Sequence, residues 1–410
     1  MHKQQHQKFT LHRSLLTTFA VMLSIALPQL SSAQTFQVIH NFTGGTDGGN
    51  PSYTLAQDTA GHFYGTAFTG GDGEGIVFRF SRVNSGWVLV PLYNFSDTDG
   101  QPGWGVTLAP DGTIYTNAMY ASVLGGPCGT AMQLRPSPTP PHSVISNWTP
   151  TDMRTYVKSQ DGCPTGNLLL DSAGNLYGVT QSGGPNGWGA VFELTKTDSG
   201  WTESILYAFT GGDDGGAPYS GLIMDSAGNL YGTATAKGAF NQGTVFELSP
   251  SGSGWTEKVL YSFQGGNDGG QPVAGVIFDS AGNLYGATAS WGSGRGGTVF
   301  KLAPSGGGSW TYSVLASLTG ADGPVASLTI DASGNLYGTT FMDDPSGFGN
   351  VFKLTHSDGN WTYTDLHDFT GGTDGGNPGG GVVLDSSGNI YGTTVAGGAN
   401  GFGVIYQITQ

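Results

Sequence analysis

Apolar and polar positions alternate in short runs that recur along almost the whole chain. In the clearest copy, residues 221–263, four such runs are separated by turn-forming segments rich in Gly, Asp and Ser. The last run, Trp255–Phe263, places Trp, Glu, Val, Tyr and Phe on one face, and Thr, Lys and Ser face the other way. This period of two, with many aromatic and β-branched residues, predicts β-strands. No segment after residue 33 has a helical period, so we expect an all-β fold.

One octapeptide, Asp225–Gly232, marks a unit that is repeated seven times. Its Asp and Gly predict a hairpin loop in which the carboxylate accepts hydrogen bonds from backbone amides and the glycine takes a positive φ. The intervals between the tyrosines of successive copies are 51, 62, 54, 54, 52 and 54 residues, from Tyr64 through Tyr115, Tyr177, Tyr231, Tyr285 and Tyr337 to Tyr391. Seven units of four short antiparallel strands predict a seven-bladed β-propeller.

The two ends of the repeat region predict how the ring closes. The seventh unit has only three strand-like runs, the last at Val404–Ile408. An additional run, Phe36–Phe42, precedes the first unit and aligns with Glu257–Phe263, the fourth strand of the clearest copy. We therefore expect the N-terminal strand to complete the last blade, which leaves no unpaired sheet edge. The alternative, an open solenoid of β-units, exposes two hydrophobic ends.

The second unit departs most from the pattern, with an interval of 62 residues. We predict its fourth strand at His142–Trp148, with Trp148 in the position of Phe263, and its additional residues within Thr149–Gln160. Either this blade has drifted in sequence, or its rim is specialised.

The chain's two cysteines, Cys128 and Cys163, both lie in this unusual region. The first belongs to the loop between the second and third strands of unit two, and the second to the crossing into unit three. In a propeller both connections emerge on one face, and an exported protein permits a disulfide. We predict that they pair, with two free thiols as the alternative. A metal site is not expected, because no histidine lies near them in the sequence.

The first 33 residues predict a secretory signal peptide. Basic residues precede an apolar run at 15–30, and small residues precede Gln34. An uncleaved membrane anchor is the alternative. Cleavage leaves one propeller domain, residues 34–410, which we expect to be extracellular or periplasmic, monomeric and without direct membrane contact.

Charge limits the partners of this domain. Removing Lys3, Lys8 and Arg13 leaves 11 basic residues against 29 acidic ones, a net charge of −18. Such a chain repels nucleic acid and anionic lipid, so neither is an expected partner. Cations and neutral ligands such as glycans remain open.

Three motifs resemble a known repeat. The patterns L-Y-x-F-x-G-G-x-D-G-G-x-P, D-x-x-G-N-L-Y-G-T and G-T-V-F-E-L resemble the GloVer tandem repeat of exported bacterial proteins. The middle pattern is also similar to propeller repeats of two-component regulators, with Tyr in place of Trp. The resemblance covers Phe36–Gln410. It implies the propeller fold and export, and it implies no catalytic motif.

Each unit carries an Asp-Gly pair just after its outermost strand, and a proline follows within four residues. We expect these turns to surround one mouth of the central channel. The carboxylates either cap their own turns or form an acidic mouth that binds cations, with calcium as the candidate cofactor. The residues are Asp47, Asp99, Asp161, Asp214, Asp268, Asp322 and Asp374.

Aromatic residues in the Gly-rich loops are expected on the same face. They either stack on sugar rings or pin the glycine loops to the blades, and Trp188 and Trp291 are the strongest candidates for exposed platforms. The full set is Phe68, Tyr120, Trp188, Phe240, Trp291, Phe348 and Phe402.

Catalytic motifs are not evident in the sequence. The mature chain has five histidines without metal-ligand spacing, and it has no nucleophile elbow or phosphate-binding loop. We therefore expect a secreted binding or structural module with a carbohydrate or cell-surface partner. The alternative is a secreted glycan-active hydrolase or lyase with carboxylates at the channel mouth.

Overall fold

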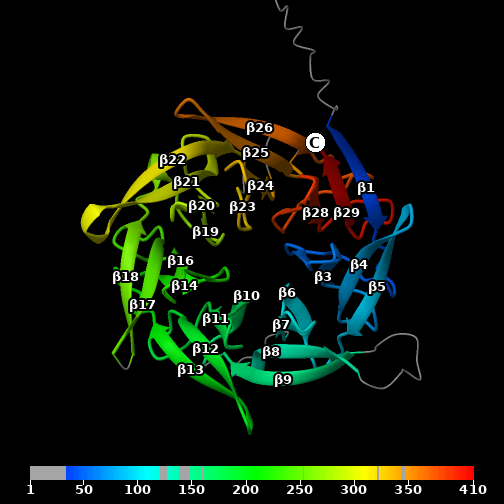
Figure 1. The fold of residues 1–410 in the computed structure, drawn as a ribbon, viewed down its shortest axis with the longest axis horizontal. Coiled ribbons are helices and arrows are strands. Elements are labelled where there is room, and N and C mark those ends of the chain that lie inside the picture. The colour runs from blue at the N-terminus through cyan, green and yellow to red at the C-terminus, as the bar shows by residue number, and fades with distance from the viewer. Residues whose placement is uncertain are drawn as a thin grey trace, which may run out of the picture. The chain divides into compact units, whose positions relative to one another are not determined.

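The computed structural model describes residues 34–120, 127–137, 148–158, 160–252, 254–320, 323–342 and 347–410. Within these residues seven antiparallel sheets surround a central axis (Figure 1). The predicted seven-bladed propeller is confirmed. Besides strands and loops, the described residues contain two short 3₁₀ helices, η1 (Gly266–Asp268) and η2 (Gly306–Gly308). No helix there is long and apolar enough to cross a membrane.

Each blade has its first strand at the axis and its fourth strand at the rim. Blade 1 comprises β2 (Ala56–Gln57), β3 (Phe63–Ala67), β4 (Ile76–Val83) and β5 (Gly86–Asn94). Blade 2 comprises β6 (Gln101–Leu108), β7 (Ile114–Met119), β8 (Pro127–Pro136) and β9 (Trp148–Val157). Blade 3 comprises β10 (Pro164–Leu170), β11 (Leu176–Thr180), β12 (Ala190–Thr197) and β13 (Gly200–Ala208).

Blades 4 to 6 follow the same order. In blade 4 the innermost position is divided between two short strands that both pair with β16. Blade 4 contains β14 (Gly216–Pro218), β15 (Ile223–Met224), β16 (Leu230–Ala236), β17 (Thr244–Ser251) and β18 (Gly254–Ser262). Blade 5 contains β19 (Ile277–Phe278), β20 (Leu284–Thr288), β21 (Arg295–Ser305) and β22 (Ser309–Thr319). Blade 6 contains β23 (Thr329–Ile330), β24 (Leu336–Thr340), β25 (Asn350–Ser357) and β26 (Asn360–Asp368).

Blade 7 contains both ends of the described chain. It consists of β27 (Val383–Leu384), β28 (Ile390–Thr394), β29 (Val404–Thr409) and β1 (Thr35–Asn41), with β1 paired antiparallel to β29. The predicted closure by the N-terminal strand is confirmed. The closing strand also contacts blade 6, because the ring of Phe36 stacks on His367 of β26 with centroids 3.6 Å apart.

The apolar core lies within and between neighbouring blades. The glycine of the Leu-Tyr-Gly motif makes room for a phenylalanine of the next strand: a Cβ at Gly232 would lie 2.7 Å from the ring of Phe246. Tyr64 of blade 1 packs against the core of blade 2, which contains Ile114 and Leu134. The repeated motif therefore encodes the contacts that stack one blade on the next.

Hydrogen bonds around the axis also join neighbouring blades. In blades 1, 4, 6 and 7 the threonine after the motif glycine donates to a backbone carbonyl of the next blade's inner segment. Thr66 bonds the carbonyl of Trp104 at 3.0 Å, and Thr339 bonds that of Gly380 at 2.9 Å. In blade 2 an asparagine replaces the threonine, and Asn117 bonds the carbonyl of Gly166 at 3.0 Å. These bonds fix the backbone that lines the channel.

Blade 2 corrects one prediction. Its fourth strand is β9, so the predicted position of Trp148 at the strand's end is wrong. Trp148 pairs with Pro136, as Trp255 pairs with Pro250 in blade 4, and it therefore begins the strand. Its side chain packs on the blade core. The additional residues lie between β8 and β9 and not within 149–160; residues 142–147 lie outside the described part of the chain.

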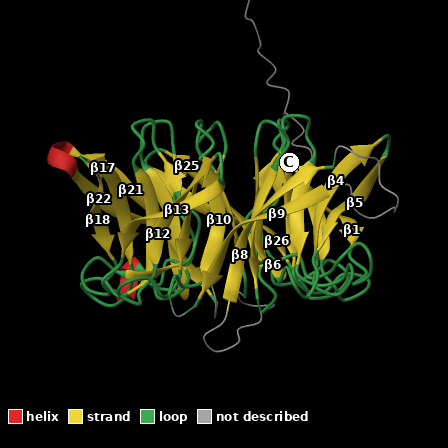
Figure 2. Cartoon of the chain, turned by 90° about the horizontal axis from the view of Figure 1, so that it is seen from below, coloured by secondary structure: helices red, strands yellow, loops and turns green. Residues whose placement is uncertain are grey.

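The ring has two different faces. Figure 2 shows strands running between two layers of loops and turns. Because the strands of a blade alternate in direction, the Asp-x-x-Gly hairpins lie on one face. The Asp-Gly crossings and Gly-rich loops lie on the other, where Gly49 and Thr69 exchange backbone hydrogen bonds.

Candidate functional site

The described Asp-Gly carboxylates serve their own turns. Asp214 accepts hydrogen bonds from the amide of Thr210 at 2.7 Å and from the hydroxyl of Tyr207 at 2.9 Å. In most of the other described turns, the carboxylate contacts the residue that lies seven positions before the aspartate, on the outermost strand. Asp99 is the exception, because it contacts Tyr93, six positions before it. The pairs are His40–Asp47, Tyr93–Asp99, Arg154–Asp161, Tyr261–Asp268 and His367–Asp374. Asp322 lies outside the described residues.

These contacts favour the turn-capping interpretation of the seven aspartates. Their partners belong to the rim strands, and none of the six described aspartates lines the cavity in the channel. Among the described residues, no group of three His, Cys, Asp or Glu side chains is arranged to hold a metal ion. Calcium binding stays a prediction.

Three of the loop aromatics pin glycine turns. A Cβ at Gly211 would lie 2.3 Å from the ring of Trp188, so that turn requires glycine. The backbone carbonyl of Trp188 also accepts the amide of Ala217 at 2.8 Å, and Lys237 lies 4.3 Å above the indole. Phe348 and Phe402 make the same contacts with the glycines of the following turns. Trp188 is therefore a packing residue more than an open platform.

The other loop aromatics do not occupy equivalent positions. Trp291 stands where Gly183 and Gly397 stand in blades 3 and 7, and it keeps their positive φ, at 70°. Its indole is 48% exposed, and Phe240 is 51% exposed. Tyr120 donates its hydroxyl to the carbonyl of Thr98 at 3.0 Å. Phe68 is partly buried.

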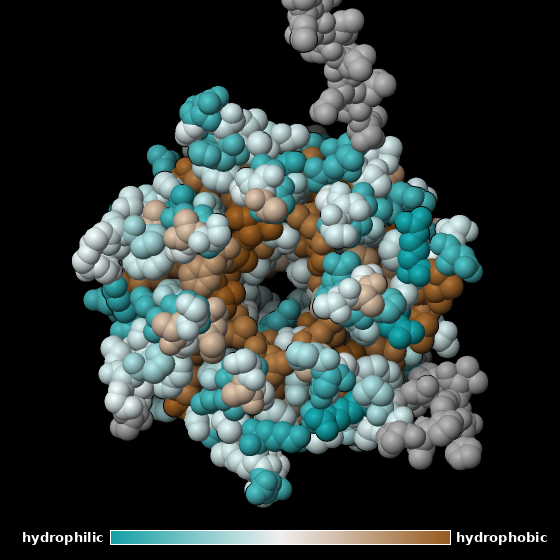
Figure 3. All heavy atoms as spheres, in the orientation of Figure 1, coloured by the Kyte–Doolittle hydropathy of each residue, from teal (hydrophilic) through white to brown (hydrophobic). Residues whose placement is uncertain are grey.

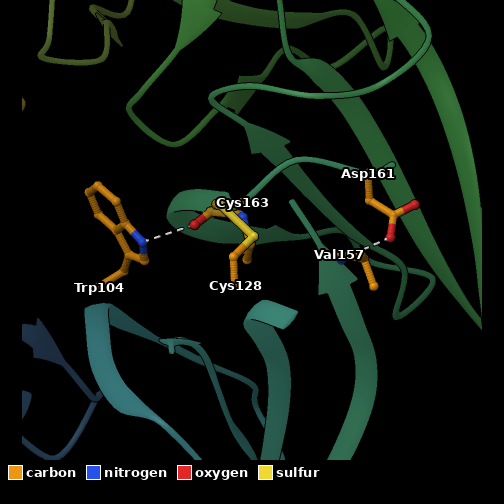
Figure 4. The surroundings of a disulfide bond; sticks show 6 residues. Trp104, Cys128, Val157, Asp161 and Cys163 are labelled. Carbon is orange, nitrogen blue, oxygen red and sulfur yellow. Dashed lines mark hydrogen bonds between the residues drawn. A yellow bond between two sulfur atoms is a disulfide. The ribbon is translucent and has the colours of Figure 1, made fainter. Parts of the chain in front are cut away.

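The predicted disulfide is present. Cys128 and Cys163 are bonded, with Cα atoms 5.4 Å apart, and they close a loop of 35 residues. A loop of this length restricts the unfolded chain by about 4 kcal/mol. The residue after Cys163, Pro164, accepts a hydrogen bond from Nε1 of Trp104 at 3.1 Å (Figure 4). The disulfide is thus next to a residue of the central channel.

The channel is lined where the repeats differ most. In each blade, a tripeptide lies between the proline that begins the inner segment and a buried leucine or valine. Turns and hairpins recur almost unchanged, but these tripeptides all differ: SYT at 52–54, GWG at 103–105, TGN at 165–167, YSG at 219–221, VAG at 273–275, VAS at 325–327 and GGG at 379–381. Sequence reasoning missed this site. Aligning the seven units at this position would have found it.

The lining encloses a cavity of about 510 Å³, which we call the channel pocket. Its apolar lining includes Leu169, Ile223 and Ile277. Hydrophobic residues surround the central opening on the face seen in Figure 3. The volume falls in the range of roughly 300–1,000 Å³ found for small-molecule sites, which are mainly apolar with a few polar groups.

Aromatic residues from blades 1, 2 and 4 form one wall of the pocket. Trp104 is buried between Tyr53 and Tyr219, and its ring centroid is 5.0 Å from each of theirs. The lining from blades 5 to 7 carries small or aliphatic residues such as Val325 and Gly380. Burial raises the pKa of both tyrosines above the usual value of 10, so both phenols are neutral at physiological pH.

Neutral polar side chains complete the lining. The amide of Asn167 lies over Gly105, where a Cβ would be 2.9 Å from Oδ1. The hydroxyls of Ser220 and Ser327 lie on either side of Gly275, 2.8 and 2.9 Å from where its Cβ would be. No charged side chain is found among the described residues of the lining.

Comparison with known proteins identifies the repeat. The family model of the Gloeobacter/Verrucomicrobia repeat matches residues 164–364 and 310–410. Among curated proteins, no sequence matches the chain.

Several solved structures are similar. A proposed 6-phosphogluconolactonase from Bacteroides uniformis has 15% identity over 78% of this chain and 84% of its own, with a TM-score of 0.48. A proposed oxidoreductase (glucose dehydrogenase) from Thermus thermophilus has 17% identity over 81% and 99%, at 0.44. A gluconolactonase from Xanthomonas campestris has 13% identity over 73% and 82%, at 0.39.

Proposed function

The chain belongs to the Gloeobacter/Verrucomicrobia repeat family, and we propose that it is an exported binding module whose ligand site is the channel pocket. The observation that carries this proposal is the variation of the seven channel tripeptides within an otherwise regular repeat. Residues of all seven tripeptides line the channel pocket, so the differences between them face one shared space. A site for one asymmetric ligand requires such differences.

The chemistry of the pocket supports a small uncharged ligand. Burying a charge without a partner is costly, and the described lining offers no charged partner. The disulfide supports export, because such bonds persist mainly in oxidising compartments.

The alternative of a glycan-cleaving enzyme has less support. That chemistry uses a pair of carboxyl groups on either side of the scissile bond. The described lining of the pocket contains no Asp or Glu, and the described Asp-Gly carboxylates are engaged in turns.

Two substitutions taken from other blades test the proposal. Tyr53→Ser introduces the residue that blade 4 has at this position, and Tyr219→Ser introduces that of blade 1. In a screen of neutral, acidic and basic saccharides and other small molecules that reads out both binding and hydrolysis, each variant should lose at least tenfold in affinity. Trp291→Gly, which removes an exposed ring from the loops, is the control and should bind as the wild type does.

Two results would overturn the proposal. One is binding that persists in both tyrosine variants but is lost in Trp291→Gly, which would place the ligand on the loops. The other is hydrolysis that disappears when a single turn aspartate is changed, as in Asp214→Asn, which would favour the enzyme.

A further inference from the structure

The channel pocket contains more neutral hydrogen-bonding groups than the protein itself satisfies. Among the described residues, no hydrogen bond involves the hydroxyls of Tyr53 and Tyr219 or the side-chain amide of Asn167, which all line the pocket. The same holds for the hydroxyls of Ser220 and Ser327. These five groups come from blades 1, 3, 4 and 6, so they surround the pocket.

This arrangement restricts the ligand. A purely apolar molecule would displace water from the five groups and leave them without hydrogen-bond partners, which is unfavourable. The ligand must therefore carry donors and acceptors on several sides. It must also present carbon–hydrogen faces to the phenol rings and to the aliphatic residues of the lining, which include Ile223 and Ile277.

We propose that the channel pocket binds an uncharged sugar ring, with Asn167 as the residue that determines specificity. A neutral pyranose combines hydroxyl groups around its edge with apolar faces, which is the combination the pocket requires. The inference rests on the proposed function of this site and adds the class of ligand.

Asn167 is singled out by its position in the repeat. The residues at this position in the other blades are Thr54, Gly105, Gly221, Gly275, Ser327 and Gly381. Asn167 is thus the only one of the seven with both a donor and an acceptor on separate atoms, so it can bond two adjacent hydroxyls at once. The glycine beneath it, Gly105, leaves the amide the space it occupies.

The test is calorimetric titration of the purified full-length chain with three probes: a panel of neutral methyl glycosides, the corresponding methyl uronides, and p-cresol. We expect at least one neutral glycoside to bind, and the matching uronide to bind at least tenfold more weakly because its charge has no partner. Asn167→Ser, the residue of blade 6, should weaken the bound glycoside about 2- to 10-fold. Asn360→Ala, in an exposed hairpin, is the control and should leave the affinity unchanged.

The outcomes separate the two proposals. Binding of p-cresol, but of no glycoside, with loss in Tyr219→Ser would overturn the sugar and keep the pocket as the site. A uronide that binds as tightly as its neutral partner, or an Asn167→Ser variant with wild-type affinity for the glycoside, would also overturn the inference. If Tyr219→Ser changed the affinity for no bound probe, the proposed function itself would fail.

Discussion

Single residues at the rim show how one repeat position serves different contacts. The residue two places after the strand-leading tryptophan packs against the preceding blade. In blade 3, Glu203 meets Arg154 with Oε2 and Nε 2.8 Å apart, and in blade 5, Tyr312 stacks on Tyr261 at 4.0 Å. Glu257 in blade 4 has no ion-pair partner among the described residues, and its Oε1 is buried without a hydrogen bond from them. Burial, and then repulsion from Asp214, raise the pKa of Glu257 to about 7.

This raised pKa predicts how stability depends on pH. The folded state keeps the proton on Glu257 up to about pH 7, and the unfolded chain releases it near its usual pKa of 4.5. Stability from this residue therefore falls as pH rises from about 4.5 to about 7. Glu257→Gln should raise the melting temperature by a few degrees at pH 8 relative to wild type, and by less at pH 5. The exposed Asp198→Asn controls for the loss of one charge; an equal shift of Glu257→Gln at both pH values would refute the assignment.

The hairpin aspartates show why one motif recurs so faithfully. Oδ1 of Asp225 accepts the amides of Ala227 and Asn229, and Oδ2 accepts the side chains of Asn229 and Tyr231. Burial alone would raise the pKa of Asp225, but these bonds outweigh it and hold the pKa below its usual value. His62, which replaces the asparagine in blade 1, reaches Asp58 with Nδ1 at 2.9 Å and makes an equivalent contact.

At the scale of elements, the closing strand β1 is paired and packed in blade 7 in the same way as the fourth strands of the other blades. Phe42, the residue after β1, is fully buried and packs on Phe78 of blade 1, with centroids 5.6 Å apart. Phe95 holds the equivalent place after β5 and is equally buried. Strand pairing through β29 and this packing together close the ring.

The two phenylalanines give a matched test of closure. Phe42→Ala and Phe95→Ala should each lower the free energy of unfolding by about 3–5 kcal/mol, because each leaves a cavity in a similar core. Chemical denaturation of both variants measures the two losses. A loss in Phe95→Ala with none in Phe42→Ala would show that the N-terminal segment does not hold the ring closed.

At the scale of the whole molecule, the fold was readable in the sequence, because the residues that recur are the residues that stack the blades. The Leu-Tyr-Gly glycine, the threonine after it and the hairpin aspartate each keep one role in the units that contain them. The position of Trp148 could not be predicted, because the alternation of apolar and polar residues fits a tryptophan at either end of a strand. Asp214, whose charge repels that of Glu257, follows the outermost strand of blade 3. The raised pKa of Glu257 therefore could not be predicted from the sequence of its own unit.

The candidate site escaped prediction for a related reason. Repeated Asp-Gly pairs and loop aromatics draw attention, yet in the structure most of them hold turns in place. The channel tripeptides carry no motif, and their meaning appears only when the seven are compared as a set around one axis. In this chain, the pocket is formed by positions that differ between blades, and the recurring positions build its support.

Crystals soaked in a mixture of neutral glycosides would show whether the channel pocket is the ligand site. We predict difference density for one sugar ring in the pocket, between Tyr219 and the residues of blades 5 to 7, with a polar atom within hydrogen-bond distance of Asn167. Density confined to the loop face beside Trp291, with an empty channel pocket, would contradict the account.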